Sequence, residues 1–188
     1  PAPSTPVLAP GSDSGTPGDN RTNVAAPVIT GTGLAGATLT LLDGILTLGT
    51  TTVDSGGHWQ ITAPALPEGN HLLTATQTDS FGNTSTASPS LSLVLDLTAP
   101  AAPLAPDLLA ASDTGASATD NVTVDTTPTF SGTTEALASV TLFDGLATLG
   151  TVVADGAGAW NFTTGILSAG MHAVSARVTD AAGNVSLA

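Results

Sequence analysis

The sequence repeats itself after about a hundred residues. Residues 27–87 align without a gap with residues 128–188, and 27 of these 61 positions are identical. For example, the segment "LLDGILTLGT" of the first copy returns as "LFDGLATLGT" in the second. A period of this length is too long for one unit of a solenoid, but it matches an autonomous β-sandwich domain. The sequence therefore predicts two copies of one domain, in residues 1–97 and 98–188.

Within each copy, apolar residues alternate with polar residues in short runs. Leu39 and Leu41 fall on one face of their run, and the threonines beside them fall on the other. Asp-Gly, Gly-Gly and Gly-Asn turns separate such runs, and no window keeps the three-and-four spacing of a helix. Alternation with a period of two is typical of antiparallel strands with one buried face. We therefore predict an all-β fold of two tandem Ig-like antiparallel β-sandwiches, each with seven short strands and with Trp59 or Trp160 facing inward.

The two copies differ at the end of the domain. A proline-rich segment, "DLTAPAAPLAP", follows the first copy, and we expect it to be a short, stiff linker. Ala188 corresponds to Ala87, so the second copy lacks a counterpart of residues 90–97, the predicted last strand of the first copy. We therefore expect the last strand of the second domain to be missing or truncated and the sheet edge beside residues 172–179 to be unpaired.

The composition argues against several classes of function. The chain has two basic residues, fifteen acidic ones and a net charge of −13, which does not suit a nucleic-acid partner. Cysteine is absent, so disulfides and thiol chemistry are excluded, and with only three histidines zinc is not favoured. No uninterrupted apolar stretch approaches eighteen residues, so we expect no membrane insertion.

Nothing in the sequence predicts an enzyme. His71 and His172 recur at the same position, the start of a strand, which favours a packing or strand-end role over catalysis. Asp43 and Asp144 each precede a glycine and are interpreted as hairpin-turn residues. No Ser/His/Asp order with a nucleophile elbow recurs, and no Gly-rich phosphate loop follows a strand.

Aspartates recur in segments rich in glycine, serine and threonine. "SDSGTPGDN" at 12–20 returns as "SDTGASATDN" at 112–121, and thirteen of the fifteen acidic residues are aspartate. Two carboxylates about 4 Å apart repel by about 4 kcal/mol at an effective dielectric constant near 20. Calcium removes this repulsion because it takes six to eight oxygen ligands, whereas an Asx-turn network without metal is the alternative. The candidate calcium ligands in these segments are Asp13, Asp19, Asn20, Asp113, Asp120, Asn121 and Asp125.

Together these motifs resemble the bacterial Ig-like repeats of giant surface adhesins and biofilm-associated proteins. The "SD-x-G…DN" opening, the "DG…LGT" hairpin, the single tryptophan, the "TDAAGN" loop and "D-x-TAPAAP" carry the resemblance, which spans essentially the whole chain. The resemblance implies a long secreted rod on the bacterial cell surface, with calcium bound at and near its domain junctions. Asp79, Asp96 and Asp180 are the candidate ligands near the domain ends, and we expect Asp96, Asp180 and the loop of Asp13 and Asp19 to converge at junctions.

The leading expectation is therefore an extracellular stalk of an adhesin, stiffened by calcium. Its expected partners are neighbouring Ig-like repeats of the same chain, and we expect this piece to be monomeric. A second interpretation is a module that binds glycan or protein, for which Phe81 is the one exposed aromatic candidate. A third is an accessory domain of a secreted enzyme.

Overall fold

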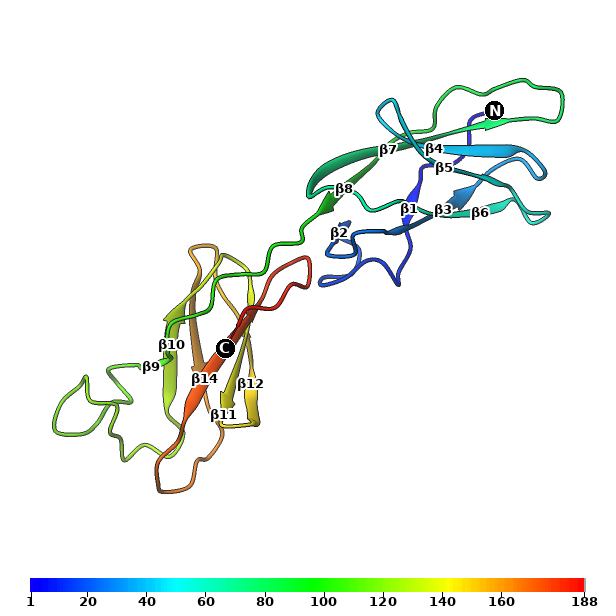
Figure 1. The fold of residues 1–188 in the computed structure, drawn as a ribbon. Helices are drawn as coiled ribbons and strands as arrows, with labels where there is room; N and C mark the ends of the chain where they lie inside the picture. The colour runs from blue at the N-terminus through cyan, green and yellow to red at the C-terminus, as the bar shows by residue number, and fades with distance from the viewer. Residues whose placement is uncertain (188) are drawn as a thin grey trace. The chain divides into compact units, whose positions relative to one another are not determined.

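The chain folds into two compact units, Pro1–Leu97 and Thr98–Ala188. The computed structural model describes residues 1–187, and within them only strands, turns and loops occur (Figure 1). The predicted all-β class is confirmed. None of the described residues belongs to a helix long and apolar enough to cross a membrane.

The first domain contains eight strands in two sheets. One sheet has the order β1-β3-β6, and the other has the order β2-β8-β7-β4-β5. All pairs are antiparallel except β2 with β8, which is parallel. The strands are β1 (Val7–Leu8), β2 (Arg21–Thr22), β3 (Val28–Thr32), β4 (Thr38–Asp43), β5 (Leu46–Thr52), β6 (His58–Thr62), β7 (Gly69–Thr78) and β8 (Leu91–Leu95).

Within residues 98–187, the second domain contains six strands, again in two sheets. Their orders are β13-β10-β9 and β12-β11-β14, so β14 forms one edge of its sheet. The β11–β12 hairpin has its register shift at Leu142/Phe143, the position equivalent to the shift at Leu41/Leu42 in the first domain. The strands are β9 (Asp107–Leu108), β10 (Thr129–Thr133), β11 (Ser139–Asp144), β12 (Ala147–Val153), β13 (Ala159–Thr163) and β14 (Val174–Thr179).

The prediction of seven strands is therefore wrong for the first domain. The first domain has one more strand because the two-residue β2 pairs in parallel with β8, with Arg21 opposite Val94 and Thr22 opposite Leu95. No counterpart of β8 lies in the described part of the second domain, so its residues 122–123 have no such partner and form no strand. A two-residue strand exists only where a neighbouring strand offers hydrogen bonds.

The core follows the predicted alternation. Ile29, Leu39, Leu41 and Leu73 are completely buried in the first domain, and the leucines of β8 are buried with them, Leu93 completely. Full burial of one such side chain stabilises a fold by about 1.5–3 kcal/mol. In the second domain Val174, the equivalent of Leu73, is only partly buried against its core. The core of the second domain is therefore more open than that of the first.

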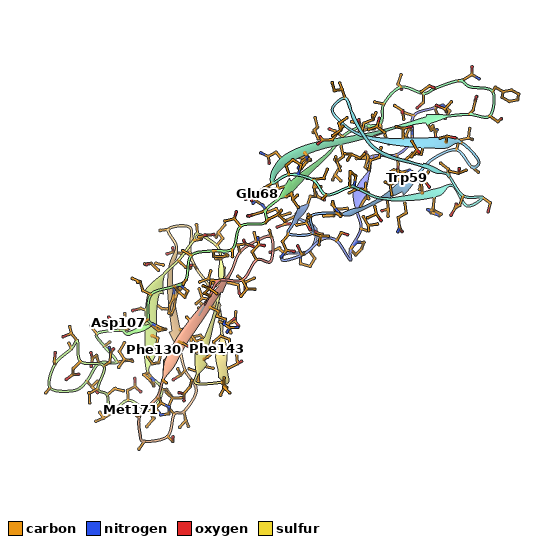
Figure 2. All side chains as sticks on the ribbon, in the orientation of Figure 1. Trp59, Glu68, Asp107, Phe130, Phe143 and Met171 are labelled. Atoms are coloured by element: carbon orange, nitrogen blue, oxygen red, sulfur yellow. The ribbon has the colours of Figure 1, made fainter. Side chains whose placement is uncertain are left out.

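Each tryptophan packs flat against a glycine of the neighbouring strand. Trp59 is 4% exposed and lies opposite Gly31, and Trp160 is 3% exposed and lies opposite Gly132. A Cβ atom added to Gly31 or Gly132 would lie 2.5 or 2.4 Å from the indole ring. The inward position predicted for both tryptophans is confirmed, and Figure 2 shows Trp59 among the side chains of the first domain.

Candidate functional site

The acidic loop of the first domain is held by hydrogen bonds within the loop. Asp13 accepts a hydrogen bond from the backbone N–H of Gly18 through Oδ2, whereas its Oδ1 is buried without a partner. Asp19 Oδ1 accepts from the N–H of Arg21 at 2.8 Å, which forms an Asx-turn. Asn20 has a positive φ of 58°, a conformation that asparagine adopts more readily than most residues.

The acidic loop of the second domain repeats this arrangement. Asp113 is only 5% exposed, its Oδ2 accepts from the N–H of Asn121 at 3.2 Å, and its Oδ1 is buried without a partner. Asp120 Oδ1 accepts from the N–H of Val122 at 3.1 Å. Asn121 has a φ of 56° and accepts from the N–H of Leu108 at 3.0 Å. The two loops thus share an aspartate whose carboxylate accepts one hydrogen bond through Oδ2 and has a buried Oδ1 without a donor.

Asp125 has both of its carboxylate oxygens occupied. Its Oδ1 accepts from the N–H and hydroxyl of Thr127 at 2.9 and 3.3 Å, and its Oδ2 accepts from the Ser112 hydroxyl at 3.1 Å. The backbone N–H of Thr127 in particular, with the hydroxyls of Ser112 and Thr127, holds the pKa of Asp125 below its ordinary value. The carboxylate of Asp125 therefore accepts hydrogen bonds from groups of its own loop.

Ser112 connects this loop to the sheet. Its hydroxyl donates to Asp125, and its Oγ accepts from the N–H of Thr129 on β10 at 3.0 Å. Ser12 accepts from Val28 in the same way at 2.9 Å. We expect Ser112→Ala to lower the free energy of unfolding of the second domain by about 1 kcal/mol, the usual value of such a hydrogen bond. Urea unfolding of the full chain measures the loss. An unchanged urea midpoint for the second domain would contradict this prediction.

The "TD…GN" loops are closed in the same manner in both domains. Asp79 Oδ1 accepts from the N–H groups of Phe81 and Asn83, each at 2.9 Å. The Asn83 side chain, with these backbone groups, lowers the pKa of Asp79. Asp180 Oδ1 accepts from the N–H of Asn184 at 2.8 Å, and its Oδ2 accepts from the Asn184 amide at 2.9 Å. Asp79 and Asp180 therefore act as loop caps in this structure.

The predicted ligands are thus distributed over separate loops. Asp96, at the end of the first domain, donates through its backbone N–H to the carbonyl of Thr22 at 3.0 Å. Within residues 1–187 no three side chains of the His, Cys, Asp and Glu type converge to hold a metal ion. The Oδ1 atoms of Asp13 and Asp113 are the groups that fit a cation. Each is buried without a hydrogen-bond donor, and burying an anionic oxygen in that way costs free energy.

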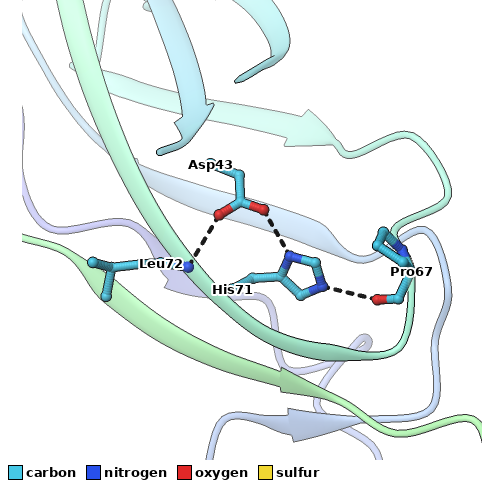
Figure 3. A network of polar contacts seen from close by, with 4 residues as sticks. All are labelled: Asp43, Pro67, His71 and Leu72. Atoms are coloured by element: carbon cyan, nitrogen blue, oxygen red, sulfur yellow. Dashed lines mark hydrogen bonds and ion pairs between the residues drawn. The ribbon is translucent and has the colours of Figure 1, made fainter. Parts of the chain in front are cut away.

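Each domain also contains a histidine–aspartate pair that the sequence did not predict, and Figure 3 shows the pair of the first domain. Asp43 Oδ2 lies 2.7 Å from His71 Nδ1, and Asp144 Oδ2 lies 2.7 Å from His172 Nδ1. The sequence indicates only turn residues for these aspartates and a packing or strand-end role for these histidines. The available signal was that an aspartate and a histidine recur in both copies at the same separation of 28 residues.

Comparison with protein-family models identifies the family to which this chain belongs. The family model described as bacterial Ig-like domain matches residues 1–97 and again residues 99–188. The chain belongs to the bacterial Ig-like domain family. The predicted tandem Ig-like sandwiches are therefore confirmed, whereas a search of curated proteins found no match.

Two solved structures are similar to this bacterial Ig-like chain at low sequence identity, the first of them with a shared fold. The fibronectin(III)-like modules of Clostridium thermocellum CbhA are 16% identical with a TM-score of 0.52, covering 97% of this chain and 89% of theirs. A biofilm-associated protein BSP domain is 19% identical with a TM-score of 0.33. That match covers 88% of this chain but only 26% of the other, so this chain spans about a quarter of that structure's length.

Proposed function

We propose that the two domains are consecutive extender repeats of a bacterial surface adhesin, exposed outside the cell, with calcium stiffening their acidic loops. The observation that carries the extender role is the duplication itself. The two hairpins β4–β5 and β11–β12 keep the same pairing and the same bulge, and the same tryptophan–glycine contact stabilises both sandwiches. Repeating one module along a chain lengthens the molecule while each module keeps its own core.

The calcium part of the proposal rests on Asp13 and Asp113. Each keeps one buried carboxylate oxygen without a hydrogen-bond donor, and the chain has no lysine to neutralise it. A buried carboxylate is stabilised by pairing or by coordinating a metal. Calcium would bind these oxygens together with backbone carbonyls and amide or carboxylate oxygens of the same loops. It would supply positive charge to a segment that is too polar to be ordered by packing.

We expect calcium to raise the melting temperature of the chain and EGTA to reverse the rise. At a free calcium concentration of about one hundred times the Kd, binding to the folded state adds about 2.7 kcal/mol. For a domain of about 90 residues, this corresponds to about 10 °C or more in Tm. Calorimetry in calcium and then in EGTA measures the shift. Small-angle scattering on the same samples measures the maximum dimension and tests the junction hypothesis.

Asp113→Asn distinguishes a bound cation from an Asx-turn network without metal. Asparagine keeps an acceptor for the N–H of Asn121 but removes the charge, so the calcium-dependent rise should shrink in the second domain. Asp155→Asn is the matched control, because Asp155 Oδ1 accepts from the N–H groups of Ala157 and Ala159 in the turn between β12 and β13. That variant should melt lower by the same amount in calcium and in EGTA. Identical melting and dimensions in both buffers would refute calcium stiffening.

The alternative function is a module that binds a ligand, and a direct binding assay distinguishes such a module from an extender. Phe81 at the tip of its loop is 90% exposed, whereas Ala182 at the equivalent position is buried. An extender should give only background signal on a glycan array and in a cell-binding assay. Reproducible binding that disappears in Phe81→Ala would instead support the binding module.

A further inference from the structure

Both ring nitrogens of His71 face oxygen acceptors. Nδ1 lies 2.7 Å from Asp43 Oδ2, and Nε2 lies 2.9 Å from the backbone carbonyl oxygen of Pro67. Asp43 Oδ1 accepts in turn from the N–H of Leu72 at 3.1 Å (Figure 3). A neutral imidazole carries one N–H and can donate to only one of the two acceptors. The complete arrangement therefore requires a doubly protonated, cationic His71.

The second domain builds the same arrangement from a different loop sequence. His172 Nδ1 lies 2.7 Å from Asp144 Oδ2, and Nε2 lies 2.9 Å from the carbonyl oxygen of Ser168. Asp144 Oδ1 accepts from the N–H of Ala173 at 3.0 Å. Serine stands where the first domain has proline, so what the two loops share is the position of a backbone carbonyl. Two loops of different sequence thus present the same acceptor to the same imidazole.

We propose that the histidine–aspartate pair of each domain forms a pH-sensitive clasp. The clasp fastens the connection before β7 in the first domain, and the connection before β14 in the second, to the adjacent hairpin turn. When the imidazole is protonated, it bridges the turn aspartate and the carbonyl of Pro67 or Ser168. When Nε2 loses its proton, its lone pair faces the carbonyl oxygen, and that bond is replaced by repulsion. Nδ1–H continues to donate to the aspartate, so the carbonyl side of the clasp opens first.

The charges around each histidine favour the cation. Burial lowers the pKa of His71, but the hydrogen bonds to Asp43 and Pro67 and the charge of Asp43 outweigh it, so the pKa is raised. The carbonyl of Ser168 and then Asp144 raise the pKa of His172. His172 also lowers the pKa of Asp144.

Few other titratable groups lie on the elements around the clasp. Glu68 follows Pro67 in the first domain, whereas the connection from 164 to 171 in the second has no titratable side chain. Strands β5, β8 and β12 have none either. On β14, Arg177 lies over the ring of Phe143, 5.9 Å from its centroid. Asp43 and Asp144 therefore provide the closest charges.

The sign of the effect follows from linkage. A histidine whose pKa is raised by folding contributes stability that is complete below the unfolded-state pKa of about 6.5 and lost as pH rises through the folded-state pKa. Asp144, whose pKa is lowered, contributes stability above about pH 4 and loses it on acidification. Between the unfolded-state and the folded-state pKa of one histidine, each unit by which the pH rises lowers the folding equilibrium constant by at most about tenfold per clasp.

Proton NMR of the histidine rings in the full chain tests the clasp directly. His58 is exposed at the start of β6, outside the clasp. His71 and His172 should titrate above the ordinary histidine pKa of about 6.5, and their Nε2–H protons should exchange slowly below pH 6. Titration of both histidines at or below about pH 6.5 would overturn the proposal without any variant.

Unfolding at a series of pH values from 6 to 9 tests the consequence. The folding equilibrium constant of the wild type should fall across this range, and the fall should largely disappear in the double variant His71→Gln, His172→Gln. His58→Gln should keep the wild-type dependence. A double variant as pH-sensitive as the wild type would overturn the clasp, and if that variant does not fold, the NMR titration of the wild type decides.

Discussion

Trp160→Ala is expected to lower the free energy of unfolding of the second domain by about 3–5 kcal/mol, the usual cost of removing a large buried aromatic side chain. Trp160 is 3% exposed and belongs to the core cluster that includes Phe130, Val140 and Leu142. The surrounding side chains cannot close the space left by an indole, so the loss of contact is added to the loss of burial. Trp59→Ala should have the same effect in the first domain.

Each variant retains the other tryptophan as a fluorescent reporter, because each domain has one. Urea unfolding followed by fluorescence and by circular dichroism therefore assigns the loss to one domain. In Trp160→Ala the transition reported by Trp59 should keep its midpoint. A change in melting temperature below one degree for either variant would mean that the indole does not contribute to the core.

Gly132→Val is expected to destabilise the second domain by about 3 kcal/mol, at the upper end of what overpacking usually costs. Gly132 lies opposite Trp160 in the β10–β13 register, and a Cβ atom there would meet the indole at 2.4 Å. The indole would have to leave its position, because the atoms in contact belong to its rigid ring. Calorimetry of the full chain measures the loss as a lower melting temperature of one transition.

Gly165→Ala is the matched control for Gly132→Val. A Cβ atom at Gly165 meets nothing within 4 Å, and the residue is exposed. Its substitution should leave both transitions within about 0.5 kcal/mol of the wild type. If Gly132→Val melts like this control, the flat contact between indole and glycine does not exist in solution.

The duplication and the alternation of apolar residues were sufficient to predict the fold class and the inward tryptophans. A strand with one buried face must place its apolar residues two apart, so the burial of Leu39 and Leu41 could be inferred without a structure. The number of strands could not be inferred. β2 has two residues and no pattern of its own, and it exists because β8 offers it a partner.

The acidic loops show a similar division. Their recurrence and their Asx-turn chemistry could be recognised from aspartate and asparagine next to glycine and serine. Which carboxylate oxygens are already occupied could not be recognised. Asp125 uses both oxygens on Ser112 and Thr127, whereas Asp113 keeps one buried oxygen free, and these assignments depend on how the loop folds back on β10. The calcium site itself remains a prediction.

The fold class and the two-domain organisation of this protein could thus be predicted from its sequence, because periodicity, turns and duplication are local or repeated signals, whereas the family came from the resemblance of its motifs. The histidine–aspartate clasp could not, because Asp43 and His71 lie 28 residues apart and meet only when β4 pairs with β7. The third member, a backbone carbonyl, has no sequence signature at all and differs between Pro67 and Ser168. The pairing of strands that are distant in the sequence brings these groups within hydrogen-bonding distance. Protonation of the histidine therefore contributes to the stability of the fold.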